Sequence, residues 1–290
     1  MYWSTEVRSL YDIQSILYLI LFPTLIVIQW NLEQVNLVLY GLLCILPLGI
    51  TAINHNIGHV PIWKSPMLNR CTEYVAGTLQ GVPLFLFKTI HVDSHHRYNQ
   101  GEKDATRVSR VGEHNHILGY LAYPLFTLGP VRKLRKEYFR TISFRSAEFR
   151  KIILQHVLLF ILWSLSLYIS WKKAFLFVFV PQLIGIHFLM ASNYLQHAQC
   201  EQGSAHNHSR NFTGWVFNLL FFNVGYHTAH HLDQKIHWTK LPNAHQEIQS
   251  QVDTRFCKRN FIGYFVLDLS VFPFLQILGF FSAKEVKNFD

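Results

Sequence analysis

The feature that most constrains this chain is a set of nine histidines, arranged in spaced groups beside long apolar segments. The groups read His55-x3-His59, His91-x3-His95-His96, His197 and His227-x2-His230-His231. Residues at i, i+3 and i+4 lie on one helix face. The pairs His55/His59 and His91/His95 and the set His227/His230/His231 therefore each predict imidazoles on one side of a helix, with His96 projecting to one side of its helix. Asn193 precedes His197 by one helical turn and shares its face. Four helix faces can therefore direct imidazoles into one volume, which predicts a metal-binding head built on membrane helices.

The composition supports a membrane location. The chain has 290 residues, of which 50% are hydrophobic and 15% are charged, whereas soluble domains carry about 25% charged residues. The formal charge of +9 is compatible with nucleic-acid binding, but the apolar segments favour anionic lipid headgroups or an acidic redox partner, and we expect no nucleic-acid partner. The 4 cysteines form no CxxC pair, which argues against an iron–sulfur cluster, a zinc ribbon or a disulfide framework.

Four apolar segments have about the 20 residues that a helix needs to cross a bilayer. They cover residues 13–30, 35–53, 152–171 and 174–195. A short polar link joins the first two and Lys172-Lys173 joins the last two, so we predict an all-α integral membrane fold with four transmembrane helices in two hairpins. Residues 261–281 are a possible fifth span or an interfacial cover. We expect a single domain over residues 1–290, because the histidine groups converge only within one unit.

The segment between the hairpins, residues 60–151, is rich in Lys and Arg. By the positive-inside rule it lies on the cytoplasmic side, and so do the histidines of the predicted head; Lys172-Lys173 on the opposite face is a small exception. Apolar stretches near residues 75–90 and 117–130 are short and contain Gly and Pro. We predict that they are interfacial or re-entrant helices.

The histidines differ in what their surroundings predict. Neutral imidazole suits zinc, copper, iron and nickel, and nine are too many for one tetrahedral ion with four ligands, so two metals are indicated. Isolated histidines in apolar helices are usually packed and hydrogen-bonded, as we expect for His156 and His187. The pairs His114-x-His116 and His206-x-His208 occur in polar loops and are expected to be exposed.

Ligating histidines need an acceptor for their other ring nitrogen. Four carboxylates near the histidine groups are candidates for that role: Asp93, Asp104, Glu73 and Asp233. His237 and Trp238, which follow the last group, are candidates to line the site; alternatively, Trp238 marks the membrane interface.

The sets HNIGH (55–59), HVDSHH (91–96), NYLQH (193–197) and HTAHH (227–231) resemble the histidine boxes of the membrane fatty acid desaturase superfamily, which includes alkane hydroxylases and carotenoid ketolases. The resemblance covers about residues 35–245. It implies two non-haem irons, with Asn193 in a supporting, water-mediated role. The implied metal ligands are His55, His59, His91, His95, His96, His197, His227, His230 and His231. The second box has the longer spacing of alkane hydroxylases and some bacterial members, where most desaturases have two intervening residues, so the branch stays open.

The resemblance implies O2-dependent oxidation of a lipid hydrocarbon chain, with fatty acyl desaturation first. Hydroxylation of an alkane or fatty acid, or oxidative decarboxylation to a terminal alkene, is the alternative within this class. The chain lacks haem, flavin, nicotinamide and iron–sulfur motifs, so a separate ferredoxin-, rubredoxin- or cytochrome-type donor is expected. The basic residues between 97 and 151 would dock an acidic donor or hold anionic headgroups.

Two functions of other classes stay open at this point. A zinc or iron transporter predicts ligands near the bilayer midplane, whereas these histidines lie at helix ends and in the basic segment. A haem protein that carries electrons needs only a pair or two of facing histidines, and it leaves the HxxHH pairs without a role. Iron content and the optical spectrum separate the three.

Overall fold

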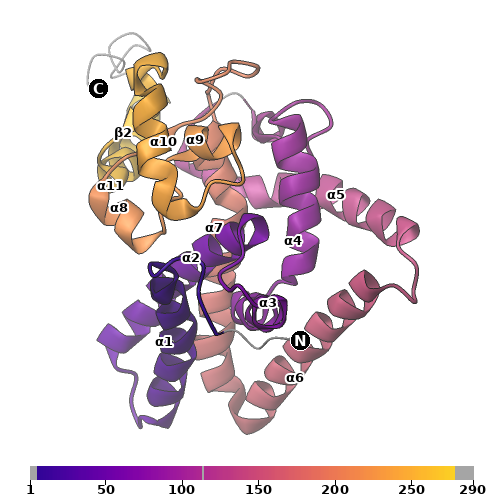
Figure 1. Ribbon diagram of the computed structural model, residues 1–290. Helices are drawn as coiled ribbons and strands as arrows, with labels where there is room; N and C mark the ends of the chain where they lie inside the picture. The colour runs from indigo at the N-terminus through magenta and orange to yellow at the C-terminus, as the bar shows by residue number, and fades with distance from the viewer. Residues whose placement is uncertain (1–4, 113, 278–290) are drawn as a thin grey trace. The chain divides into compact units, whose positions relative to one another are not determined.

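The computed structural model describes residues 5–112 and 114–277, and the chain forms two compact units. Unit 1 comprises Met1–Asp93 and Lys133–Leu189, and unit 2 comprises Ser94–Arg132 and Met190–Asp290. The described structure is mostly helical (Figure 1). Helices α5 and α7 and the π-helical turn η1 each contribute residues to both units.

Unit 1 is built from apolar helices and shorter connecting ones. Its elements are α1 (Asp12–Asn31), α2 (Leu37–His59), α3 (Pro66–Gln80), α4 (Leu84–Ile90), the start of η1 (His91–His96), the end of α5 (Ile117–Thr141), α6 (Ala147–Ala174), η3 (Phe175–Phe179) and most of α7 (Val180–His197). The helices predicted near residues 75–90 and 117–130 are present as α3, α4 and α5. Their interfacial placement stays a prediction.

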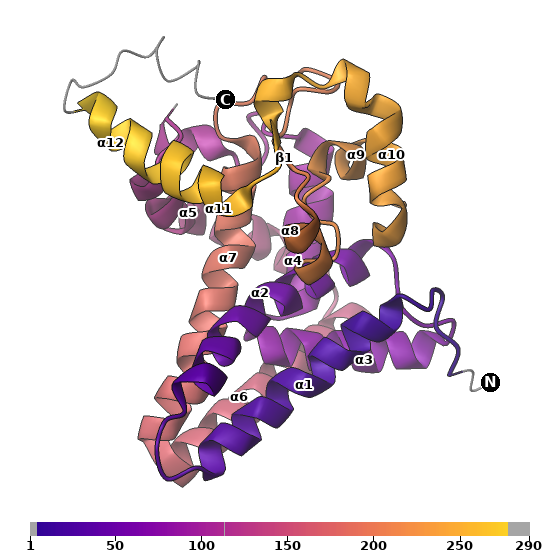
Figure 2. The same cartoon turned by 90° about the vertical axis from the view of Figure 1, so that its left-hand side faces the viewer.

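Helices α1 and α2 form the expected hairpin (Figure 2). Asn36 begins α2, because its side-chain oxygen accepts hydrogen bonds from the amides of Val38 and Leu39, a common N-cap arrangement. The buried Gln29 closes the link: its side-chain oxygen accepts from the Asn36 amide at 3.1 Å and its amide donates to Gln34 O at 3.3 Å.

Three helical segments among the described residues are long and apolar enough to cross a membrane: Asp12–Asn31, Leu37–His59 and Ala147–His197. The third is 51 residues long, more than twice the length of about 20 residues that one crossing requires. Its regular geometry breaks at Ser170, where φ is −164° and ψ is 106°, and the chain turns back between α6 and α7 in Figure 2.

The link expected at Lys172-Lys173 is therefore wrong in position, since both lysines are helical residues of α6 and the break precedes them. Lys173 donates a hydrogen bond to Trp30 O. It thereby caps the C-terminal end of α1, where free carbonyls favour a cation. The indole of Trp163 donates to Gln182 Oε1 at 2.8 Å and joins α6 to α7.

A buried polar layer holds the helices of unit 1 together. The amide of Gln155, with no exposed surface, donates to Glu73 O at 3.0 Å and accepts from Leu84 N at 2.9 Å. Gly77 makes room for it, since a Cβ there would lie 1.9 Å from Gln155 Nε2. The Thr51 hydroxyl joins α2 to α7 through Gly185 O at 3.0 Å. Such interhelical hydrogen bonds are typical of helices packed in membranes.

Unit 2 combines short helices with a small parallel ladder. Its elements are the end of η1, η2 (Val108–Val111), the start of α5, the end of α7, β1 (Asn211–Phe212), α8 (Trp215–Leu220), α9 (His227–Leu232), η4 (Trp238–Lys240), α10 (Leu241–Ile248), η5 (Gln249–Gln251), η6 (Thr254–Phe256), β2 (Cys257–Lys258), α11 (Phe261–Gly263), η7 (Tyr264–Val271) and α12 (Phe272–Ile277). Asn211 pairs with Cys257, and Phe212 with Lys258. The core is aromatic, with Tyr123 and Tyr194 in ring contact.

The possible fifth span is shorter than a full crossing among the described residues. The apolar helical stretch covers Phe261–Leu275, which falls short of the length of about 20 residues that one crossing needs. Residues 278–281 of the expected segment lie outside the described residues.

Candidate metal centre

Four of the nine predicted ligands gather within unit 2. His95, His197, His227 and His231, called here the four-histidine cluster, each offer one ligand atom, and these atoms lie within 4.8 Å of one another. The Nε2 atoms of His95 and His231 are 3.2 Å apart, and those of His197 and His227 are 2.9 Å apart. The first three residues named are buried. The spacing of the histidine groups therefore predicted this convergence correctly.

The backbone around α9 fixes the last histidine group. Thr228, fully buried between His227 and His230, donates its amide to Asn211 Oδ1 at 2.9 Å, and its hydroxyl pairs with that of Ser209 at 2.8 Å. Gly225 precedes the helix at a close approach, since a Cβ there would lie 2.1 Å from Phe212 O. These contacts anchor α9 on strand β1 and orient its three histidines.

Hydrogen bonds at Nδ1 set the tautomers of two cluster members. The Nδ1 atom of His95 is 3.0 Å from Asp104 Oδ2, and that of His197 is 2.9 Å from the backbone oxygen of His208. Both oxygens only accept, so each Nδ1 carries the proton and each Nε2 presents a lone pair. Metal-ligating histidines have this arrangement.

Among the four carboxylates considered from the sequence, Asp104 is the one with a hydrogen bond to a predicted ligand. Its side chain is fully buried. Burial raises the pKa of Asp104, but hydrogen bonds from His95 and Thr106 outweigh that effect and hold its pKa well below the usual range. Asp104 is therefore a carboxylate that orients and polarises His95.

The donor set fits a metal ion. With metal–nitrogen bonds near 2.1 Å, adjacent ligands on one ion are separated by about 3.0–3.4 Å, and the paired Nε2 atoms of the cluster lie at 2.9 and 3.2 Å. Lone pairs that face each other at this separation in a buried site require a proton or a cation between them. Neutral imidazole is a ligand that iron accepts.

Two further predicted ligands form a second pair in unit 2. The Nε2 atoms of His96 and His230 are 3.0 Å apart, and both side chains are buried. His96 follows His95 in η1, and His230 lies on α9 between cluster members. Their separation has the same ligand-like value as the pairs in the four-histidine cluster.

The remaining three histidines gather within unit 1. His55 and His59 lie one turn apart at the end of α2, and His91 begins η1. One ligand atom of each lies within 4.8 Å of those of the other two, and their ring centroids are 4.6–5.2 Å apart. Phe87 stacks on His91 at 4.9 Å and an interplanar angle of 12°. We call these residues the three-histidine group.

Asn193 takes part in a hydrogen-bond network of unit 2. Its amide donates to Thr106 O and to the Tyr123 hydroxyl, both at 2.6 Å, and accepts from Gln100 Nε2 at 3.2 Å. The Gln100 amide donates to Asp104 Oδ2 at 3.0 Å. The network thus joins Asn193 of the NYLQH set to the carboxylate that holds His95.

Sequence reasoning did not identify Gln100. This residue is 2% exposed, and its φ of 67° lies in the left-handed region, which costs a residue with a side chain about 1–2 kcal/mol. Its side-chain oxygen accepts from the Val108 amide at 2.8 Å. A buried glutamine just after the second box was a weak signal, because its contact with Asn193 spans 93 positions of the chain.

The loop and helix histidines gave a mixed result. His156 is hydrogen-bonded within its helix as predicted, with Nδ1 2.8 Å from Ile152 O, but it is exposed and not packed. The expectation that both His206 and His208 are exposed was wrong for His208, which is 5% exposed. The loop folds back onto α7, where the backbone oxygen of His208 accepts a hydrogen bond from His197 Nδ1. His237 hydrogen-bonds to Thr239 within its own turn.

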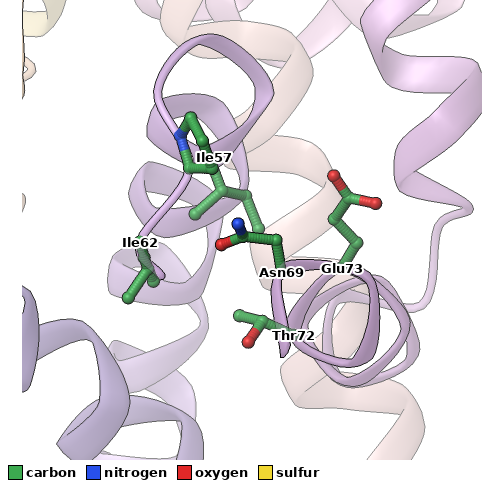
Figure 3. A pocket seen from close by; sticks show the side chains of 6 residues that line it. Ile57, Ile62, Asn69, Thr72 and Glu73 are labelled. Atoms are coloured by element: carbon green, nitrogen blue, oxygen red, sulfur yellow. The ribbon is translucent and has the colours of Figure 1, made fainter. Parts of the chain in front are cut away.

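A shallow hollow in unit 1 lies beside the end of α2. Figure 3 shows Ile57, Ile62, Asn69 and Thr72 around it, with the carboxylate of Glu73 directed away from Thr72. Its enclosed volume is close to 0 Å³, whereas pockets that bury small-molecule ligands measure about 300–1,000 Å³. The hollow is therefore too small to hold a long lipid chain.

Comparison with known families decides the identity of the chain. The model of the family described as fatty acid desaturase matches residues 35–262, which is most of the sequence. The chain belongs to the fatty acid desaturase family. The match contains all nine histidines, Asn193 and the carboxylate Asp104. A search among curated proteins gave no match. As a fatty acid desaturase family member, the chain is an oxidoreductase of lipids, and its histidine groups are potential metal sites.

Proposed function

We propose that this protein oxidises the hydrocarbon chain of a lipid with O2, using two non-haem irons held by the nine histidines. The observation that carries the proposal is the four-histidine cluster, in which paired Nε2 atoms lie 2.9 and 3.2 Å apart while Nδ1 of His95 and of His197 is held by an acceptor. A structural site closed by four ligands would need no further histidines.

The bound irons would supply, together with O2 and reductant, the oxidising power that an unactivated C–H bond requires. The chain's own residues prepare the place for them. Asp104 and the His208 carbonyl fix the tautomers of His95 and His197. The burial of these groups keeps water from the ligand atoms, which limits side reactions.

The leading reaction is desaturation of a fatty acyl chain, in which two hydrogens leave neighbouring carbons. Hydroxylation and oxidative decarboxylation to a terminal alkene need the same oxidising centre and differ in where the chain lies. Each of these reactions consumes electrons besides those of the substrate. We propose a separate ferredoxin-, rubredoxin- or cytochrome-type donor.

We propose a multi-pass membrane protein with four crossings and the metal centre on the cytoplasmic side. Support comes from the three apolar helical segments and from the break at Ser170, which divides the longest of them. The basic C-terminal part of α5 is the proposed docking face for the donor. Arg132, Lys133, Lys136 and Arg140 are exposed there, and an acidic partner would be steered toward such a face.

Lipid analysis tests the reaction. Cells that express the wild-type protein are compared with cells that express His230→Ala, resolving fatty acids, alcohols and volatile hydrocarbons. A new double bond that is lost in the variant supports desaturation, whereas a hydroxylated chain or a terminal alkene assigns the alternative. Identical lipid profiles, together with purified protein that holds no iron, would contradict the proposal.

A further inference from the structure

A tenth histidine lies beside the four-histidine cluster, and the proposed chemistry makes no use of its imidazole. His208 lies in the loop between α7 and β1, within unit 2. Its ring centroid is 5.3 Å from that of His231 and 6.4 Å from that of His197. Inside the cluster the ring centroids are separated by 4.5–6.4 Å. These two separations lie within the range found inside the cluster, but the ligand atom of His208 is not among the four that lie within 4.8 Å of one another, so coordination would require its ring to move toward the ion.

The hydrogen bonding of His208 determines which ring nitrogen carries the lone pair. Nδ1 lies 3.1 Å from the backbone oxygen of Ser204. Because a carbonyl oxygen only accepts, Nδ1 is the protonated nitrogen and Nε2 holds the lone pair. His95 and His197 have the same pattern, with Nδ1 donating to an oxygen and Nε2 in the cluster. His208 thus has the tautomer of a ligating histidine.

The other ring nitrogen of His208, Nε2, has no hydrogen-bond partner among the described residues. Nε2 is buried and makes no hydrogen bond to any of them, and the whole side chain is 5% exposed. Leaving a buried polar atom without a partner costs about 1–3 kcal/mol. A cation is the partner that this nitrogen fits.

We propose that His208 coordinates, through Nε2, the metal ion held by the four-histidine cluster. The inference rests on the proposed metal centre and adds a fifth imidazole that the family's histidine boxes do not contain. Iron sites commonly keep positions open beyond their protein ligands, so five nitrogens leave room for oxygen. The loop from residue 198 to 210 is then part of the metal site, not only its cover.

A side-chain substitution at residue 208 can be tested without disturbing His197. His197 is oriented by the backbone oxygen of residue 208, which every side-chain substitution keeps. In His208→Asn the side-chain amide lies near the position of Nδ1 and still donates to Ser204 O, while the nitrogen at the Nε2 position is lost. His208→Gln fills more of the ring volume and offers a non-basic amide there. His206→Asn, a change in the same loop at a half-exposed residue, is the matched control.

The measurement is titration of the purified full-length protein, in detergent and free of metal, with Co(II). Affinity is followed by the visible absorption bands of cobalt, whose energy and intensity depend on the ligand set. Melting temperatures of the metal-free variants are compared first. We expect His208→Asn and His208→Gln to melt like the wild type, to bind one cobalt about tenfold or more weakly, and to show altered bands, whereas His206→Asn keeps wild-type values.

Wild-type affinity and unchanged bands in both His208 variants would overturn the inference and leave the metal centre intact. If His208→Asn lowers the melting temperature, the larger His208→Gln carries the same comparison. A wild-type protein that binds no cobalt would instead contradict the proposed function. The two proposals therefore fail in different measurements.

Discussion

The histidines of the two units are held differently. In unit 2 the cluster members His95 and His197 are buried, with Nδ1 tied to a carboxylate and to a backbone carbonyl. In unit 1 the members of the three-histidine group are half-buried, the Nδ1 atom of His55 lies 3.0 Å from Asn56 Oδ1, and the ring of Phe87 stacks on His91. Burial keeps water away from ligand atoms. We infer that unit 2 holds its metal in a better shielded environment.

The largest effect expected is the loss of a ligand, and it tests the comparison directly. His197→Ala removes a nitrogen 2.9 Å from that of His227, and we expect metal affinity to fall by more than about 100-fold, since even partners of ligands are worth 10–100-fold. His91→Ala should lower metal affinity by a factor about ten times smaller, because the three-histidine group is more open to water. Iron or cobalt titration measures both. Equal losses would break the comparison.

The next effect concerns the carboxylate behind His95. Asp104→Asn removes the charge that accepts from His95 Nδ1 at 3.0 Å and from the Gln100 amide. We expect a 10–100-fold loss of metal affinity. Asp233→Asn is the matched control, because Asp233 is exposed and accepts only from its own turn, at the Lys235 amide. A similar loss in the control would show that the effect is not specific to His95.

A smaller effect is expected in the network around Gln100. Gln100→Ala removes bonds to Asn193 and to the Val108 amide, which should lower the free energy of unfolding by about 1–3 kcal/mol. Gln100→Gly loses the same bonds but relieves the positive φ of 67°, so it should be less destabilising by about 1 kcal/mol. Chemical denaturation compares the two. If glycine is the worse variant, the strain argument is wrong.

The smallest effect is expected at the aromatic support of unit 1. Phe87→Leu keeps an apolar side chain but removes the stacking on His91 at 4.9 Å, a contact worth about 0.5–1.5 kcal/mol. We expect a loss of metal affinity below about tenfold and little change at the sites of unit 2. Phe85→Leu on the same helix is the control, since the ring of Phe85 packs edge-to-face against Tyr74 instead. A loss as large as that of Asp104→Asn would remove the contrast between the units.

Regular spacing explains what the sequence predicted well. The positions of the histidines on helix ends follow from the i, i+3 and i+4 pattern, and the apolar segments follow from their length. The break at Ser170 was missed because Trp171, Lys172 and Lys173 gave no sign that the helix continues through them. A charged pair between two apolar segments predicts a connecting loop. Here Lys173 instead donates to Trp30 O and caps the end of α1.

The parts of the site that were missed depend on contacts between distant residues. Gln100 meets Asn193 across 93 positions, and the burial of His208 arises from the path of a polar loop. Neither has a period or a spacing that a sequence motif would show. The side chain of Gln100 donates to Asn193, and the backbone oxygen of His208 accepts from His197. Both contacts form only when the chain is folded.

The two supports of the four-histidine cluster differ in how they tolerate evolutionary change. His95 depends on the side chain of Asp104, so one codon change can remove its partner. His197 depends on the main-chain carbonyl of residue 208, which every amino acid supplies. A single substitution can therefore remove the partner of His95, whereas the partner of His197 is lost only if the loop moves. The residue at 208 is free to vary in its side chain without endangering His197, which leaves selection free to tune whatever that side chain itself does.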